Sequence, residues 1–215
     1  MGFLVVAAGV SILTTIGIVV SLLLPAIQFF REVSITEFLT GTSWTPRFQD
    51  PTFGVLPLIT GTMWTTAIAL SVSIPIGLGA AIYLSEYAST RTRKVFKPTL
   101  ELLAGVPSVV YGLFAVTFVG PVVLKEWLGI EVATFSVLAA GLVLGVMIIP
   151  TVASLAEDAM SAVPRALREA SYGLGANRMR TVLRVVFPAA VSGIAAAIVL
   201  GLSRAVGETM IVAMA

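Results

Sequence analysis

The 215-residue sequence contains no cysteine, no histidine and few charged residues. The absence of cysteine excludes disulfides, thiolate nucleophiles and cysteine-based metal sites. The absence of histidine excludes a histidine zinc site, a Ser-His-Asp triad and a histidine proton relay within this chain. Asp, Glu, Lys and Arg together make up only 11% of the residues, whereas a soluble domain carries about 25%. Because so little charge cannot cover a water-facing surface, most of the surface must face lipid.

Hydrophobic residues make up 58% of the sequence, and they gather in long uncharged runs. Each run meets or nearly meets the roughly 20 residues that a helix needs to cross a bilayer. The runs are continuously apolar rather than alternating, which favours helices over barrel strands. The net charge of +2 is too small and too scattered to indicate a nucleic-acid partner. We therefore predict an all-α, polytopic membrane protein with five spans, within residues 3–30, 51–85, 102–124, 132–156 and 185–203.

Positive charge is concentrated in two of the segments that connect these runs. Segments 85–101 and 157–184 hold nine of the thirteen Lys and Arg residues. The positive-inside rule assigns both segments to the cytoplasm, so we expect a cytoplasmic N-terminus and an extracytoplasmic segment 31–56. No Lys or Arg precedes the first run, which favours a membrane span over a signal peptide. The chain is still apolar where it stops at Ala215, and we expect it to be a fragment.

Segment 157–184 has the pattern of a short amphipathic helix–turn–helix. Pro164 suits a first helical turn, Gly173 and Gly175 end the helix, and Asn177 can cap the next one. Apolar residues recur at three- and four-residue steps and form one face, namely Val163, Ala166, Leu167, Ala170 and Leu174. The polar residues point elsewhere, namely Arg165, Arg168, Glu169 and Tyr172. The apolar face either lies passively on the membrane interface or enters a groove of a soluble partner.

The same segment carries a motif. Glu169-Ala170-Ser171, three residues, Gly175, nine residues and Val-Val-Phe-Pro188 closely resemble the EAA loop of ABC importer permeases. That family's pattern is Glu-Ala-Ala, three residues, Gly, nine residues and Ile-x-Leu-Pro. In such permeases the loop forms a coupling helix that docks in a cleft of the ATPase subunit. The resemblance therefore implies that these five numbered residues serve in ATPase coupling.

The resemblance extends over nearly the whole chain. The stretches at 53–62, 83–87, 104–114 and 201–210 are similar to the permeases of the phosphate-specific importer. Trp44-Thr-Pro46 and the sequence Ser-Leu-Ala-Glu-Asp-Ala at 154–159 are more similar to its PstC-type subunit than to its PstA-type partner. The resemblance implies a type I, MetI-like permease fold, with a first helix and extracytoplasmic loop at 1–56 and a permease core at 57–215. Permeases of this subunit normally have six spans, so the sixth is expected to be missing here.

The resemblance also implies the surroundings of the chain. A PstC-type permease moves phosphate through the bacterial inner membrane as a multi-pass subunit, together with a PstA-type permease, two ATPase subunits and an extracytoplasmic phosphate-binding protein. The chain has no phosphate-loop motif, so we expect no cofactor in it, no enzymatic activity of its own, and ATP bound by the partner. The alternatives are a permease for molybdate or sulfate and a secondary anion transporter, although no inverted repeat is evident. An intramembrane enzyme lacks a catalytic constellation.

Arg204 and Glu208 are the only charged residues inside an apolar span, and such residues are functional candidates by default. Their i,i+4 spacing allows them to meet on one helix face. That face also carries small residues every four positions, namely Gly193, Ala197, Gly201 and Ala205, which favour close helix packing. The pair is either structural, or Arg204 attracts a phosphate oxyanion while Glu208 keeps it from trapping the ion. The resemblance favours the substrate pathway. Gly105-Val-Pro107-Ser108 either helps to line a cavity or only kinks the third span, and we expect a kink.

Overall fold

The computed structural model describes residues 2–133 and 135–214. Over these residues the elements of the protein are helices, and the β-type pairing is limited to one isolated antiparallel bridge between Trp44 and Phe53. Five helices are long and apolar enough to cross a membrane, namely Leu4–Glu32, Leu56–Tyr87, Ser108–Trp127, Val137–Ser161 and Val191–Met214. The predicted all-α architecture with five spans is therefore confirmed. The chain divides into two compact units, Met1–Thr60 and Gly61–Ala215.

The first unit contains α1 (Gly2–Glu32) and α2 (Ile35–Thr40), followed by an extended segment. The ring of Phe29 packs edge-to-face on Phe38 and Phe53, with ring centroids 5.7 and 5.2 Å apart. The backbones of Gly41 and Gly54 lie so close that a Cβ on either residue would overlap the other residue. Aromatic packing and this glycine contact therefore order the segment between α1 and the next long helix, which begins at Leu56.

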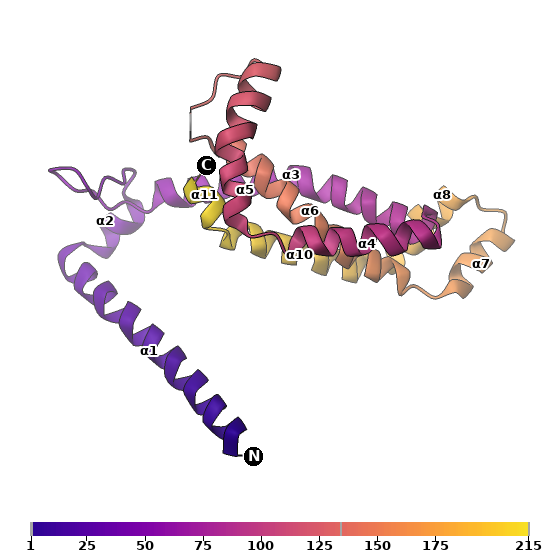
Figure 1. Cartoon of the computed structure of the whole chain (residues 1–215), viewed down its shortest axis with the longest axis horizontal. Helices are drawn as coiled ribbons and strands as arrows, with labels where there is room; N and C mark the ends of the chain where they lie inside the picture. The colour runs from indigo at the N-terminus through magenta and orange to yellow at the C-terminus, as the bar shows by residue number, and fades with distance from the viewer. Residues whose placement is uncertain (1, 134, 215) are drawn as a thin grey trace. The chain divides into compact units, whose positions relative to one another are not determined.

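The second unit is built around a bundle of four helices, which lie side by side in Figure 1. They are α3 (Leu56–Ile82), α4 (Thr90–Ala104), α6 (Val137–Ser161) and α10 (Val191–Gly207). The most buried of the five membrane helices is α6, because its glycines allow neighbouring helices to approach. A Cβ at Gly145 would lie 2.9 Å from the carbonyl oxygen of Ala69, and a Cβ at Gly141 would lie 2.7 Å from Cβ of Ile68.

The small-residue face of α10 packs on α6, as the four-residue periodicity predicts. Ala197, Gly201 and Ala205 are buried. A Cβ at Gly201 would lie 3.0 Å from Val152, and a Cβ at Gly193 would overlap the side chain of Ala159. Any larger side chain on this face would push α10 away from the centre of the bundle.

The third predicted span, 102–124, is not continuous, and the expectation that Pro107 only kinks it is wrong. The helix α4 ends at Ala104, and α5 (Ser108–Phe114) begins after a turn. Proline has no N–H and disfavours helical backbone in the residue before it, and Pro107 itself has an extended ψ of 135°. The helix α5 continues into the π-helical stretch η2 (Ala115–Trp127), and together they run across the bundle direction (Figure 1).

Most of segment 85–101, predicted as a connecting loop, forms the helix α4. Ser89 caps this helix, because its hydroxyl oxygen accepts a hydrogen bond from the backbone N–H of Thr92 at 3.1 Å. A Ser-Thr-Arg-Thr sequence before the basic residues was the available signal for this helix start. The short helix α11 (Met210–Met214) packs on α5, where a Cβ at Gly112 would lie 3.1 Å from Cβ of Met214.

Candidate functional site

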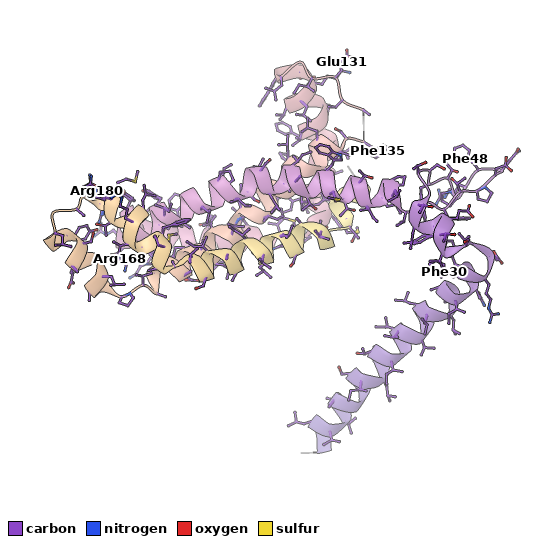
Figure 2. All side chains as sticks on the ribbon, turned by 180° about the vertical axis from the view of Figure 1, so that it is seen from behind. Phe30, Phe48, Glu131, Phe135, Arg168 and Arg180 are labelled. Atoms are coloured by element: carbon purple, nitrogen blue, oxygen red, sulfur yellow. The ribbon has the colours of Figure 1, made fainter. Side chains whose placement is uncertain are left out.

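Segment 157–184 folds as the predicted helix–turn–helix at one end of the bundle, where Figure 2 labels Arg168 and Arg180. The segment contains α7 (Arg165–Gly173), α8 (Arg178–Thr181) and the start of the π-helical turn η3 (Val182–Val186), and α9 (Phe187–Ala189) follows it. Gly175 has a φ of +80°, a left-handed conformation that L side chains rarely adopt. Asn177 caps α8 and accepts the N–H of Arg180 at 2.9 Å. The glycine turn and the asparagine cap are therefore confirmed.

The helix α7 turns its polar side toward the bundle and its apolar side outward. Leu167 is 45% exposed and Leu174 is 90% exposed, and Ala166 and Ala170 are exposed as well. Only Val163 of the predicted apolar face is buried. Large exposed apolar side chains on a loop at the end of a bundle are typical of a surface that another molecule covers.

Arg168 attaches α7 to the bundle. Its Nη2 donates to Oε1 of Glu86, in the π-helical turn η1 (Tyr83–Tyr87), at 2.7 Å, and its Nε donates to the same oxygen at 3.1 Å. The guanidinium also donates to the carbonyl oxygens of Val163 at 2.6 Å and Met160 at 2.8 Å. The side chains of Arg168 and Glu86 are 15% and 5% exposed. One largely buried guanidinium therefore joins α7 to the ends of both α3 and α6.

The other residues of the motif lie along the same loop. Ser171 Oγ and Thr181 Oγ1 share a hydrogen bond of 2.9 Å, which joins α7 to α8. Glu169 and Ala170 are exposed on α7, and Pro188 lies in α9, where the chain returns to the bundle. The structure thus brings Glu169, Ala170 and Ser171 together on one helix, with Gly175 in the turn that follows.

A second group of charges, missed by the sequence reasoning, joins α4 to α6 at the same end. Arg93 and Lys97 are one helical turn apart on α4, and both form ion pairs with Glu157, whose side chain is only 1% exposed. Burial opposes the charge of Lys97, but hydrogen bonds with Asp158 and Glu157 outweigh that effect and raise the pKa of Lys97. Segments 85–101 and 157–184 therefore lie at one end, consistent with their assignment to the same side of a membrane.

Arg204 and Glu208 do not form the i,i+4 pair that their spacing allows, because α10 ends at Gly207 between them. Glu208 instead accepts the N–H groups of Met210 at 3.1 Å and Ile211 at 3.4 Å, and so caps α11. No ion pair joins Arg204 to any carboxylate within the described ranges. The periodicity could not predict this difference, because it assumes that the helix continues through both residues.

The side chain of Arg204 instead joins three helices. Its Nη1 donates to Thr151 Oγ1 of α6 at 2.9 Å, and its Nη2 donates to the carbonyl oxygen of Ala104 at 3.1 Å. That carbonyl belongs to the last residue of α4 and is free because the break before Pro107 ends the helix there. Among the residues that the structure describes, the partners of the half-buried Arg204 are therefore a carbonyl and a hydroxyl, and no carboxylate.

A profile of the family described as "binding-protein-dependent transport system inner membrane component" matches residues 73–215. The chain belongs to this family. Its members are transport permeases rather than enzymes, and the five apolar helices make this member a multi-pass membrane protein.

Several curated relatives support a PstC-type permease. A probable ABC transporter permease protein of Bacillus subtilis, YqgH, is 39% identical over 98% of this chain and 66% of its own length. The phosphate transport system permease protein PstC of Mesorhizobium japonicum is 34% identical over 96% and 68%. PstC 1 of Mycobacterium tuberculosis is 38% identical over 83% and 62%. The chain thus spans about two thirds of the length of these relatives.

The fold is also similar to that of a solved permease structure. A chain of the MetNI methionine ABC transporter, in inward-facing conformations, aligns with a TM-score of 0.53 and 22% identity. The alignment covers 72% of this chain and 68% of that chain. This similarity confirms the predicted MetI-like permease fold.

Proposed function

We propose that the chain is the PstC-type permease subunit of an ATP-driven phosphate importer and forms half of the translocation pathway. The relatives named PstC support phosphate as the substrate. The observation that carries the proposal is the guanidinium of Arg204, which lies between three helices with a carbonyl and a hydroxyl as partners.

The geometry of Arg204 favours an anion. A guanidinium has five N–H groups in a planar fork that matches the oxygens of a phosphate. The partners Thr151 and Ala104 are neutral, so they orient the fork without neutralising its charge. A cation inside a membrane bundle is costly unless it serves a substrate or a partner. In this proposal Glu208, four residues further along the chain, also borders the substrate pathway, where its carboxylate caps α11.

The outward apolar face of α7 supports docking in a cleft of a separate ATPase. In this proposal Glu169, Ala170 and Ser171 lie on the docking helix, Gly175 forms its turn, and Pro188 sets the return of the chain to the bundle. ATP is bound by the partner, and this chain carries no cofactor of its own.

The helix α6 offers a direct link between the docking helix and Arg204. Its C-terminal carbonyl of Met160 binds Arg168, and its Thr151 binds Arg204. The two positions are nine residues apart, about 14 Å along a helix at 1.5 Å per residue. A displacement of α7 by an ATPase would therefore act on the surroundings of Arg204 through one rigid element.

The proposed assembly follows the family. It contains phosphate, a PstA-type permease, two ATPase subunits, an extracytoplasmic phosphate-binding protein and surrounding lipid in a bacterial inner membrane, with the N-terminus in the cytoplasm. Residues 1–56 would form the first helix and extracytoplasmic loop, and residues 57–215 the permease core. The second candidate, a permease for molybdate or sulfate, is supported by the same fork, because a guanidinium binds any tetrahedral oxyanion.

The test is uptake by proteoliposomes that contain the chain and its co-purified partners. We expect uptake of radiolabelled phosphate that requires ATP on the α7 side, with weak competition by sulfate or molybdate. Stronger competition by either oxyanion would favour the second candidate. Uptake without a co-purified ATPase would contradict the proposal and favour a secondary transporter.

A further inference from the structure

The sequence Ser-Leu-Ala-Glu-Asp-Ala at 154–159 contains two neighbouring acidic residues near the end of α6, and neither has a role in the proposed function. The side chain of Glu157 is 1% exposed, whereas that of Asp158 is 56% exposed. A buried carboxylate is costly unless it is paired and hydrogen-bonded. The partners of Glu157 therefore indicate what this residue holds in place.

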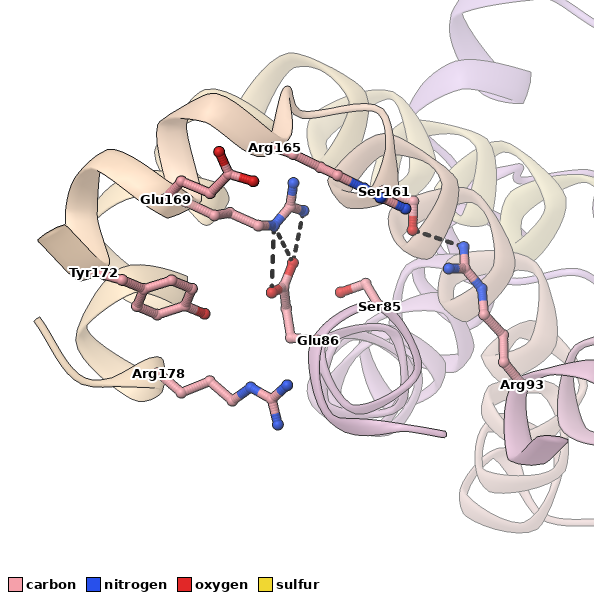
Figure 3. A pocket seen from close by; sticks show the side chains of 9 residues that line it. Ser85, Glu86, Arg93, Ser161, Arg165, Glu169, Tyr172 and Arg178 are labelled. Carbon is pink, nitrogen blue, oxygen red and sulfur yellow. Dashed lines mark hydrogen bonds and ion pairs between the residues drawn. The ribbon is translucent and has the colours of Figure 1, made fainter. Parts of the chain in front are cut away.

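Three side chains converge on the carboxylate of Glu157. Its Oε1 forms an ion pair with Arg93 and accepts the hydroxyl of Ser161 at 2.7 Å, and its Oε2 pairs with Nζ of Lys97 at 2.9 Å. Nη2 of Arg93 also donates to Oγ of Ser161 at 2.7 Å, a contact drawn in Figure 3. Two cations of α4 thus meet at one buried carboxylate of α6.

These ion pairs supply much of the attachment of α4 to the bundle. Every residue of α4 remains at least partly exposed, and the three apolar clusters of the core contain no described residue of this helix. Its less exposed residues include Arg93, Lys97, Leu100 and Ala104, whose four- and three-residue steps place them on one helix face. Because two of these four residues are the partners of Glu157, the ion pairs fix the position of α4 along α6.

The last residue of the same helix holds Arg204. The carbonyl oxygen of Ala104 accepts Nη2 of Arg204 at 3.1 Å, and Thr151 of α6 accepts Nη1 at 2.9 Å. Ala104 lies seven residues after Lys97 on α4, about 10 Å along a helix. The two arms of the guanidinium are thus held by different helices, and both hydrogen bonds form together only while α4 keeps its position on α6.

We propose that Glu157 is a positioning residue for Arg204. By fixing α4 on α6, it keeps the carbonyl of Ala104 where Arg204 can donate to it and to Thr151 at once, so the fork has one orientation. This inference rests on the proposed function, in which Arg204 attracts the transported anion. Removal of the charge of Glu157 leaves the charge of Arg204 unchanged but releases one arm of its fork.

A distance measurement tests the effect on α4 without any need for transport. Spin labels on Thr99→Cys and Val199→Cys, both at exposed positions of a cysteine-free chain, report the position of α4 relative to α10 by electron–electron double resonance. In nanodiscs, Glu157→Gln should displace or broaden the distance distribution. Asp158→Asn is the matched control from the same motif. Its side chain pairs only with Lys97 among the described residues, so the distribution should not change.

Uptake by proteoliposomes with the co-purified partners then tests the effect on Arg204. Glu157→Gln should lower the maximal rate of phosphate uptake roughly tenfold, as for the loss of one hydrogen bond to a charged group, and Asp158→Asn should stay within about twofold. In the Arg204→Gln background, Glu157→Gln should add little further loss, because the two changes act through one residue. Arg93→Gln leaves Glu157 paired with Lys97, so it should act in the same direction more weakly, and it provides the test if Glu157→Gln does not fold.

Arg91→Gln is the matched control for Arg93→Gln. Arg91 is an exposed cation of α4 without an ion pair among the described residues, so its replacement should change neither readout. Unchanged spin-label distances in both Glu157→Gln and Arg93→Gln would overturn the inference. An equal fold loss of uptake with and without Arg204 would overturn it too, because a general structural defect acts in both backgrounds. Normal uptake by Arg204→Gln alone would instead contradict the proposed function.

Discussion

The role of Arg168 in attaching α7 to the bundle can be tested by replacing this residue. In the variant Arg168→Met the long side chain remains, but the ion pair with Glu86 and the hydrogen bonds to Val163 and Met160 are lost. Glu86 is 5% exposed, so the variant leaves a buried carboxylate without its cation. Removing one partner of a buried pair costs about 3–5 kcal/mol. We expect this cost to lower the free energy of local opening of α7, because the variant releases only that helix from the bundle.

Amide hydrogen exchange measures this opening directly. A decrease of 3 kcal/mol in the free energy of opening corresponds to at least about 100-fold faster exchange of the amides of α7, because 1.4 kcal/mol is a factor of ten in an equilibrium constant. The milder variant Glu86→Gln keeps one acceptor oxygen, and the loss of a charged hydrogen bond, about 1.5 kcal/mol or more, predicts roughly tenfold faster exchange. Exchange in the middle of α6 should not change in either variant.

Arg165→Met is the matched control. This arginine lies one turn earlier on α7 and has no ion-pair partner among the residues that the structure describes. Its replacement should leave the exchange of α7 within about threefold of the unaltered chain, as for most surface changes. Equal acceleration by Arg165→Met and Arg168→Met, or none by Arg168→Met, would refute the role of Arg168. The double variant Arg168→Met with Glu86→Leu should recover part of the protection, because no unpaired charge remains.

Three further predictions concern the rest of the site. Arg204→Gln should reduce phosphate uptake at least about tenfold, whereas Glu208→Gln keeps the acceptor oxygen that caps α11 and should reduce uptake much less. Equal losses of uptake in the two variants would indicate a structural role for both residues. The double variant Arg204→Gln with Glu208→Gln should stay inactive. Gly175→Asp should abolish ATP-driven uptake with the protein still inserted, because a side chain at a φ of +80° costs about 1 kcal/mol or more and adds charge at the docking turn; normal co-purification of the ATPase and normal uptake would contradict this. Single cysteines at Thr42 and Ala176 should react with an impermeant thiol reagent from opposite sides, and labelling of both from one side would contradict the predicted orientation.

The features that the sequence determined by itself are those that repeat along one helix or lie within a few residues. Five apolar runs predicted five spans, and small residues every four positions predicted the face of α10 that packs on α6. The turn at Gly175 and the cap at Asn177 depend only on backbone conformation and on an N–H three residues away. These properties are local, so no knowledge of the neighbouring helices is needed.

The tertiary structure alone decided the partners of the charged residues. Arg168 binds a carboxylate 82 residues away, and Arg204 binds groups 53 and 100 residues away. Such pairs depend on how helices are aligned against one another, and a shift of one residue rotates a side chain by about 100° around its helix. The i,i+4 pair of Arg204 and Glu208 does not form because α10 ends between the two residues. Arg204 binds groups on α6 and α4 instead, and Glu208 caps α11.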